Sequence, residues 1–208
     1  MNDRRTHVIG LVGGIASGKS YVGRLLEELG VPRVDADVIG HEVLNRADIR
    51  EALVERFGEQ ILVDGAVDRR TLGALVFGSS PQAAENLQVL EGIVHPAIHA
   101  TVLQEVSQLT SASEPPIAIV IDAPLLLEAG WESMCDWILL IDVPDAVRLK
   151  RAQLRGWDED QFRTREAAQF SLEQKRRAAT HRIDGQASAE EIKRRLKHLL
   201  EQMKKNTR

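Results

Sequence analysis

The sequence predicts an α/β fold built on a parallel sheet of four or five short strands with helices on both faces. Strand-length apolar runs occur at 7–12, 32–35, 117–121 and 137–142, a short fifth run lies near 182–183, and helical patterns separate them. The first run also leads directly into a glycine-rich segment that begins a helix. Fully apolar strands alternating with helices are typical of parallel sheets buried on both faces.

The segment from Gly13 to Ser20 spells G-x-x-x-x-G-K-S, and a helical pattern follows it over Tyr21 to Leu29. This order suits a phosphate-binding loop, because glycines let backbone N–H groups turn onto phosphate oxygens and the helix start adds unpaired donors. Lys19 is predicted to reach the β- and γ-phosphates of a nucleotide, and Ser20 to ligate Mg²⁺. A glycine-rich turn that binds nothing is the alternative, and the flanking strand and helix argue against it. The predicted ATP-binding residues are Gly13, Gly14, Ile15, Ala16, Ser17, Gly18, Lys19, Ser20 and Tyr21.

The motif narrows the fold class to a three-layer P-loop NTPase fold with a parallel five-stranded sheet, a helical substrate-binding insertion and a small lid. Helical periodicity from 37 to about 110 is broken at Phe57-Gly58, at Asp64-Gly65 and at 78–81, and we expect the insertion there. The predicted boundaries are 1–36, 116–147 and 180–208 for the nucleotide-binding core, 37–115 for the acceptor domain and 148–179 for the lid and its following helix.

The lid prediction comes from the stretch 148–156, which carries four cations and ends at Gly156 before the acidic run 158–160. A helix that stops at a glycine and restarts suits a lid that carries cations over a phosphate site. An exposed amphipathic helix is the alternative, and the phosphate loop favours the lid.

Bulk composition excludes several classes of protein. The 208 residues are 43% hydrophobic and 28% charged, which fits one globular unit with inserted subdomains. A net charge of −4 gives no field that recruits nucleic acid, and the basic cluster at 193–197 is interpreted as a solvated helix face. The single Cys135 indicates a reducing compartment, and the apolar runs are too short for a signal peptide or a membrane span. We therefore expect a cytoplasmic protein without nucleic-acid or membrane partners, and a monomer in preference to an oligomer.

Two groups of carboxylates follow predicted strands, at the edge where open α/β sheets bind ligands. Asp35 and Asp37 would share one side if the segment is extended. We favour Asp37 as the group that accepts or orients the proton of a hydroxyl group that receives a phosphoryl group, with Asp35 as its polar neighbour. Helix capping is the alternative role for Asp37. Asp122 ends the run at 117–121 and is predicted to hold Mg²⁺ or its waters, with a cap or loop acid as the alternative. Glu128 is a weaker candidate that fits the surface equally well.

In addition to the loop and Asp35-Ala36-Asp37, several further motifs occur in a fixed order. They are Asp68-Arg69-Arg70-x-Leu72 with Val76-Phe77, His95-Pro96, Asp122-Ala123-Pro124-Leu125-Leu126-Leu127-Glu128, the pair Arg151 and Arg155, and Arg165 with Gln169. On these motifs the chain resembles dephospho-CoA kinases over almost its whole length. The loop alone is generic, whereas Asp-Ala-Asp, His-Pro and Asp-x-Pro-Leu-Leu-x-Glu together are distinctive.

The resemblance implies transfer of the ATP γ-phosphate to the ribose 3′-hydroxyl of dephospho-CoA, the last step of coenzyme A synthesis, with Mg²⁺ as cofactor. It implies that Asp37 is the catalytic base and that Lys19, Arg151 and Arg155 act on the transferring phosphates or the nucleotide. It also implies an acceptor site in the 37–110 insertion. The residues that it assigns to substrate binding are Asp35, Arg70, His95, Pro124 and Leu125. For His95, a helix-start position fixed by Pro96 without a ligand contact is an equal alternative.

The chain departs from the family pattern at four positions. Ala16 replaces a common loop glycine, and Tyr21 stands where a small hydroxyl residue is usual. Thr180 and Gly185 occupy the places of an aspartate and an asparagine that normally border the adenine.

Two other functions are compatible with a phosphate loop. Another kinase of the nucleoside-monophosphate type shares loop, lid and Mg²⁺ but differs in the acceptor subdomain. A nucleotide-binding switch belongs to a different class, and a GTPase would need an Asn/Thr-Lys-x-Asp guanine signature that no lysine here provides.

Overall fold

The structure, a computed structural model, describes residues 5–78 and 80–206. The chain forms two compact units. One consists of the chain up to Asp35 together with the chain from Val106 onward, and the other is Ala36–Glu105.

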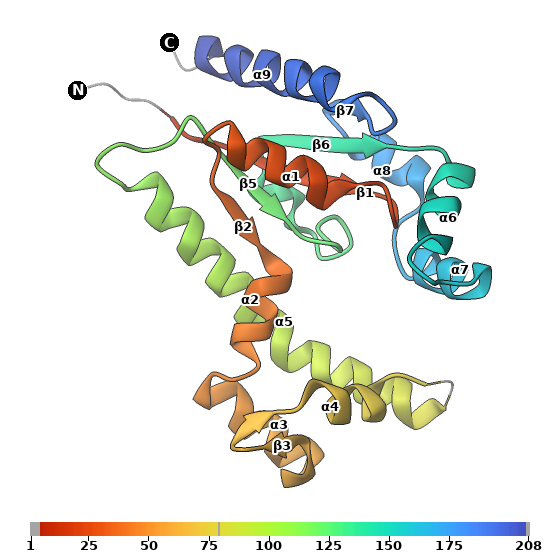
Figure 1. The fold of residues 1–208 in the computed structure, drawn as a ribbon. Helices are drawn as coiled ribbons and strands as arrows, with labels where there is room; N and C mark the ends of the chain where they lie inside the picture. The colour runs from red at the N-terminus through yellow and green to blue at the C-terminus, as the bar shows by residue number, and fades with distance from the viewer. Residues whose placement is uncertain (1–4, 79, 207–208) are drawn as a thin grey trace. The chain divides into compact units, whose positions relative to one another are not determined.

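A five-stranded parallel sheet forms the centre of the first unit, as predicted. Its strands lie in the spatial order β2-β5-β1-β6-β7 (Figure 1), and each neighbouring pair is parallel. The central strand β1 is buried along its whole length, which is why its sequence reads as a continuous apolar run. The strands are β1 (His7–Gly13), β2 (Arg33–Asp35), β5 (Ala118–Asp122), β6 (Trp137–Asp142) and β7 (His181–Asp184).

Helices α1 (Lys19–Glu28) and α9 (Ala189–Asn206) pack on one face of this sheet. Ile9 and Leu11 alternate along β1 and join Leu26 of α1 and Leu196 of α9 in one buried apolar cluster. This cluster fixes the start of α1 against the end of β1, and thereby the loop that joins them.

The connection from β6 to β7 is helical. It contains α6 (Asp145–Gln153), α7 (Glu159–Ala167) and α8 (Leu172–Ala178), and α8 contacts both β6 and β1. Between α6 and α7, Gly156 has a φ of 83°, so the helix stops and restarts at this glycine as the sequence indicated. A 3₁₀ helix, η2 (Trp131–Met134), precedes β6.

The second unit is mainly helical. The Asp64-Gly65 turn, with φ values of 51° and 78°, joins two very short antiparallel strands where the sequence indicated only a break in helical periodicity. Its elements are α2 (Ala36–Val43), α3 (Ala47–Phe57), η1 (Glu59–Ile61), β3 (Leu62–Val63), β4 (Ala66–Val67), α4 (Arg69–Val76) and most of α5 (Pro81–Thr110).

His95-Pro96 lies inside α5 and does not start a helix, so the helix-start interpretation of His95 is wrong. Proline lacks the N–H that an interior position would donate, but a long helix can carry one at the cost of a single bond. The neighbouring Val94 and Ala97 are buried, which shows that packing holds the helix together across this point.

Among the described residues, no helix combines the length and the apolar character that crossing a bilayer requires.

Candidate functional site

The segment Gly14–Gly18 links buried β1 to the first turn of α1. Gly18, the residue before the helix, has a φ of 93°, and Ala16 has a φ of 58°. The Ser17 N–H donates to the Gly14 carbonyl at 3.0 Å, which closes the loop on itself. The strand, glycine loop and helix start therefore occur in the predicted order, with the exposed N-terminus of a helix at the loop's end.

Carbonyl oxygens along the loop accept hydrogen bonds from cationic side chains. Arg148 Nη1 donates to the Ile15 carbonyl at 3.3 Å, and Arg151 Nη1 donates to the Ser17 carbonyl at 2.9 Å. Arg148 is 2% exposed, and its guanidinium also bonds the Val143 carbonyl at 3.1 Å. Both arginines come from α6, so this helix places two guanidinium groups against the loop.

The Arg148 guanidinium also explains why the loop needs a glycine at position 14. A Cβ on Gly14 would lie 2.7 Å from Arg148 Nη1, which is closer than a side-chain carbon can approach. The same guanidinium pairs with Glu166 of α7 at 2.5 Å and lies 5.5 Å from the Phe162 ring centroid. Loop, α6 and α7 are thus joined through one buried side chain.

Lys19 and Asp122 form an ion pair at the carboxyl edge of the sheet. Asp122 is 3% exposed, and in the sheet register it lies beside Asp35 of β2. The carboxylate approaches α1, since a Cβ on Gly23 would lie 3.4 Å from Asp122 Oδ2. Ser20 lies three residues before Gly23 on the same helix, and side chains at this spacing share a face. The structure therefore brings Lys19, Asp122 and Asp35 to one edge.

Arg33 is a site residue that the sequence analysis missed. Its Nη1 donates to Asp35 Oδ2 at 2.7 Å and to Asp122 Oδ2 at 3.2 Å. Burial lowers the pKa of Arg33, but the hydrogen bond to Asp122 and the charges of Asp35 and Glu27 outweigh burial and raise it overall. Arg33 and Asp35 are two residues apart on β2 and therefore lie on the same face of the strand. This spacing could have predicted the pair from the sequence.

A cavity of about 300 Å³ opens beside the loop. Arg151 and Arg155 of the α6 segment line it together with Tyr21 of α1, and Gln186 lines it from the segment after β7. Arg151 also donates to the Gly185 carbonyl at 2.8 Å. The cavity adjoins Ala16, Ser17 and Gly18, so a molecule that placed phosphates on the loop could place its remaining part here.

Comparisons with known proteins place these features in one family. A family model described as dephospho-CoA kinase matches residues 7–191. The chain belongs to the dephospho-CoA kinase family. It is 38% identical over 199 residues to the dephospho-CoA kinase of Latilactobacillus sakei, covering 94% of this chain and 95% of the relative. It is also 38% identical over 200 residues to that of Carboxydothermus hydrogenoformans, covering 95% and 94%. The solved structure of TT1252 from Thermus thermophilus superposes with a TM-score of 0.76 at 33% identity, covering 95% of this chain and 98% of that one.

Two of the four positions that depart from the dephospho-CoA kinase pattern are explained by their neighbours in the structure. Thr180 Oγ1 accepts from the Ile138 N–H at 2.9 Å, so Thr180 extends the pairing of β6 with β7. A Cβ on Gly185 would lie 2.5 Å from Val143 Cγ2 and 2.9 Å from Ile141 Cγ2. This chain therefore has no room for a side chain at position 185 without movement of its neighbours.

A third departure involves backbone strain. The φ of 58° at Ala16 lies in the left-handed region, which an alanine adopts at a cost of about 1–2 kcal/mol and a glycine adopts freely. Tyr21, the fourth departure, is 39% exposed and faces the cavity beside the loop.

Three predicted site residues belong to the helical unit. Asp37 lies exposed in the first turn of α2, which begins at Ala36, so Asp37 neither precedes the helix nor continues the extended segment that ends at Asp35. Arg70 lies in the first turn of α4, where the Asp68 carboxylate caps the helix by accepting from the Thr71 N–H at 2.7 Å. His95 is exposed on α5.

Pro124 and Leu125 are half-buried in the segment after β5, in the same unit as the loop. Glu128, further along that segment, is not a surface acid. Its side chain is 15% exposed and pairs with Lys175 of α8 at 3.4 Å, and Lys175 is a second residue that the sequence analysis missed.

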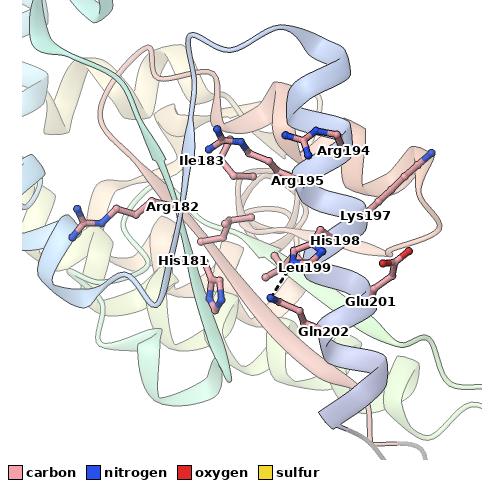
Figure 2. Close-up of a pocket in the computed structure, with 11 residues that line it drawn as sticks. His181, Arg182, Ile183, Arg194, Arg195, Lys197, His198, Leu199, Glu201 and Gln202 are labelled. Carbon is pink, nitrogen blue, oxygen red and sulfur yellow. Dashed lines mark hydrogen bonds between the residues drawn. The ribbon is translucent and has the colours of Figure 1, made fainter.

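A separate cavity of about 550 Å³ lies between β7 and α9 and shares no lining residue with the cavity beside the loop (Figure 2). Arg194 and Arg195 lie at its rim, and both bond the Glu191 carboxylate, at 2.9 Å and 2.6 Å. Their charge is partly neutralised within the helix.

Proposed function

We propose that this protein transfers the γ-phosphate of ATP to the ribose 3′-hydroxyl of dephospho-CoA, which yields coenzyme A and ADP. One observation carries the proposal: Lys19 pairs with Asp122 beside a glycine loop of the kind that binds nucleotide phosphates, in a chain that belongs to the dephospho-CoA kinase family over nearly its whole length.

The phosphates of ATP would lie on the loop, and the nucleoside in the cavity lined by Tyr21, Arg155 and Gln186. Among the described residues, the Ser17 hydroxyl is a buried group without a hydrogen-bond partner. The Ser17 side chain lies against Gly13, where an added Cβ would be 2.4 Å from Ser17 Oγ, so the glycine at position 13 leaves room for it. Lys19 would leave Asp122 to bind the β- and γ-phosphates, because a polyphosphate carries more negative charge than one carboxylate.

The residues at this edge also fit Mg²⁺, which we propose as the cofactor. Mg²⁺ keeps several waters and is usually held by one or two protein oxygens together with substrate phosphates. Ser20 Oγ and the Asp122 carboxylate are hard oxygen donors of this kind. The described residues contain no cluster of three or more acidic, histidine or cysteine side chains that would make a complete protein cage. When bound, Mg²⁺ would neutralise phosphate charge during transfer.

For the chemical step, we propose that the Asp37 carboxylate orients the 3′-hydroxyl and accepts its proton. The hydroxyl oxygen then forms the new bond to the γ-phosphorus while the bond to the β-phosphate oxygen breaks. Lys19, Arg151 and Arg155 would stabilise the charge on the phosphates, and the helical unit Ala36–Glu105 would bind the acceptor. The residues proposed for the acceptor are Asp35, Arg70, His95, Pro124 and Leu125.

A coupled assay with purified protein, ATP and Mg²⁺ tests the activity. We expect ADP release that depends on dephospho-CoA and does not occur with AMP, UMP or shikimate. Mass spectrometry and phosphorus NMR should locate the new phosphate on the 3′-oxygen. Lys19→Ala is the control variant and should lower kcat/KM by at least ~10²-fold, since it removes a charge that contacts the moving phosphate. ADP release with AMP or shikimate as acceptor would favour the alternative kinase and contradict the proposal.

We further propose a cytoplasmic monomer, on the sequence features given above. Light scattering coupled to gel filtration would detect an oligomer.

A further inference from the structure

The ammonium of Lys175 is buried against the phosphate loop. Its side chain is 2% exposed, and lysines are almost never buried to this extent without polar partners. Nζ donates to Gln169 Oε1 at 2.8 Å and to the Gly13 carbonyl at 3.3 Å, and lies 3.4 Å from Glu128 Oε1. The bond to Gly13 connects residues 162 apart in the sequence.

These partners come from three different parts of the first unit. Gly13 is the last residue of β1, Glu128 lies in the segment after β5, and Gln169 lies in the turn before α8. Glu128 Oε1 also accepts from the Phe170 N–H at 2.6 Å, which holds that turn against the same carboxylate. Lys175 therefore connects the base of the loop to the turn before α8.

The geometry of a trans peptide gives this contact a consequence for phosphate binding. The C=O of one residue and the N–H of the next lie in one plane and point in opposite directions. A cation that holds the Gly13 carbonyl therefore directs the Gly14 N–H away from Lys175. The buried Arg148 acts in the same way on the Ile15 carbonyl. Amides directed away from buried cations are the groups with which such a loop binds phosphate oxygens.

We propose that Lys175 is a positioning residue of the phosphate loop, which holds the Gly13 carbonyl so that the Gly14 amide is oriented toward a nucleotide phosphate before binding. The inference rests on the proposed function, because it assumes that the loop binds a nucleotide polyphosphate. Lys175 acts through the backbone and needs no contact with ATP. A loop that is ordered before binding loses less conformational entropy when phosphates arrive, and this raises affinity.

Lys175→Met tests the proposal, because methionine fills a similar volume without the charge. Kd values for ADP and for adenosine are measured by titration calorimetry in Mg²⁺ buffer. We expect at least ~10-fold weaker ADP binding with adenosine affinity within about 2-fold, since only ADP presents phosphates to the loop amides. Failure of wild-type protein to bind ADP would refute the proposed function itself. If the wild-type protein binds ADP and Lys175→Met has the same ratio of the Kd for ADP to the Kd for adenosine, only the role of Lys175 would be refuted.

Two further variants separate loop positioning from the loss of a buried ion pair. Arg176→Met is the matched control on α8, because Arg176 is the next residue after Lys175 on that helix and its guanidinium pairs with Asp142 at 2.9 Å. Glu128→Gln removes the negative charge beside Lys175 but keeps the bond to Gly13. We expect both variants to keep the ratio of the Kd for ADP to the Kd for adenosine within about 2-fold of the wild-type ratio. If Glu128→Gln raised this ratio as much as Lys175→Met, the contact would be structural and the proposal wrong.

Lys175→Arg keeps the test decisive if the methionine variant does not fold. Burial lowers the pKa of Lys175, the charge of Glu128 opposes this, and the charges of Lys19 and Arg148 lower it further. The ammonium is present below that pKa, so wild-type affinity for ADP should fall as the pH rises through it. An arginine stays charged, so the loss of ADP affinity of Lys175→Arg should occur at higher pH than that of the wild-type protein. Superimposable pH profiles of the two proteins would overturn the proposal.

Discussion

At the residue scale, the neighbouring groups decide whether a buried side chain is charged. Asp122 accepts from Arg33 at 3.2 Å and pairs with Lys19, so its buried carboxylate is compensated twice. Cys135 shows the opposite situation, because burial, with the charges of Asp136 and Glu132, raises the pKa of its thiol to about 12. A thiol with this pKa stays protonated at neutral pH, so Cys135 is unsuited to nucleophilic chemistry.

Replacing Asp37 by Asn should separate catalysis from nucleotide binding. The amide keeps the size of the side chain but cannot accept the hydroxyl proton, so we expect kcat to fall by at least ~10²-fold with the Kd for ATP within about 2-fold. Steady-state kinetics and titration calorimetry measure the two quantities. Asp48→Asn is the control, because Asp48 is an exposed carboxylate of the same unit that pairs with Arg46 at 2.7 Å. Turnover of Asp37→Asn equal to wild type would show that Asp37 is not the base.

Replacing Gly185 by Ala should destabilise the protein. The added Cβ would lie 2.5 Å from Val143 Cγ2 and 3.1 Å from the Ser17 carbonyl, so buried groups must move. We expect a loss of about 1–3 kcal/mol in the free energy of unfolding, measured by urea denaturation. Gly92→Ala is the matched control, since its Cβ meets nothing within 4 Å in a helix and should be neutral or stabilising by about 0.5–1 kcal/mol. Equal stabilities for the two variants would contradict the packing argument.

At the element scale, short helices near the loop carry strong start signals. Asp158 precedes α7 and Ser171 precedes α8, and each caps its helix in a complete capping box. Gln161 and Gln174 supply the reciprocal bonds. Helices of this length are marginal alone, so the caps and the buried Lys175 and Arg148 together fix them against the sheet. The sequence showed a break and restart at Gly156, which is a local property of a glycine with positive φ.

The Ser171→Ala change tests how far a cap contributes to this region. The Ser171 Oγ accepts from the Gln174 N–H at 3.2 Å, and its loss leaves that donor unpaired at the start of α8. We expect a decrease of about 0.5–2 kcal/mol in the free energy of unfolding. Ser133→Ala serves as the control, because the Ser133 hydroxyl is exposed and donates to the Gly130 carbonyl at 3.3 Å without capping a helix. A variant as stable as the control would show that the capping box is dispensable.

At the scale of the whole molecule, the predicted lid is anchored at both ends and exposed between them. Arg148 and Lys175 are each 2% exposed, whereas Leu154 is 82% and Phe170 41% exposed. Regions with few buried contacts open most easily, so motion over a bound nucleotide should be concentrated between these anchors.

Limited trypsin digestion can detect this motion. Arg155 lies in the exposed turn before Gly156, and we expect ATP with dephospho-CoA to slow cleavage after Arg155 by at least ~5-fold, since closure would remove the turn from solvent. Mass spectrometry of the fragments measures the rate at each site. Cleavage in the last turn of α9, at Lys204, is the internal reference. Identical rates with and without ligands would argue against a lid.

The sequence by itself determined the local elements: the apolar strands, the G-x-x-x-x-G-K-S loop, the start of α1 and the break at Gly156. These follow from periodicity and from backbone freedom, which act over a few residues. It also gave the family, because its motifs lie at fixed places along the chain. The tertiary structure alone decided the strand order and the partners of the loop, and it changed the interpretation of His95 and Glu128. Lys175 meets Gly13 across 162 residues, and such contacts depend on how strands align and helices pack, which no local pattern records.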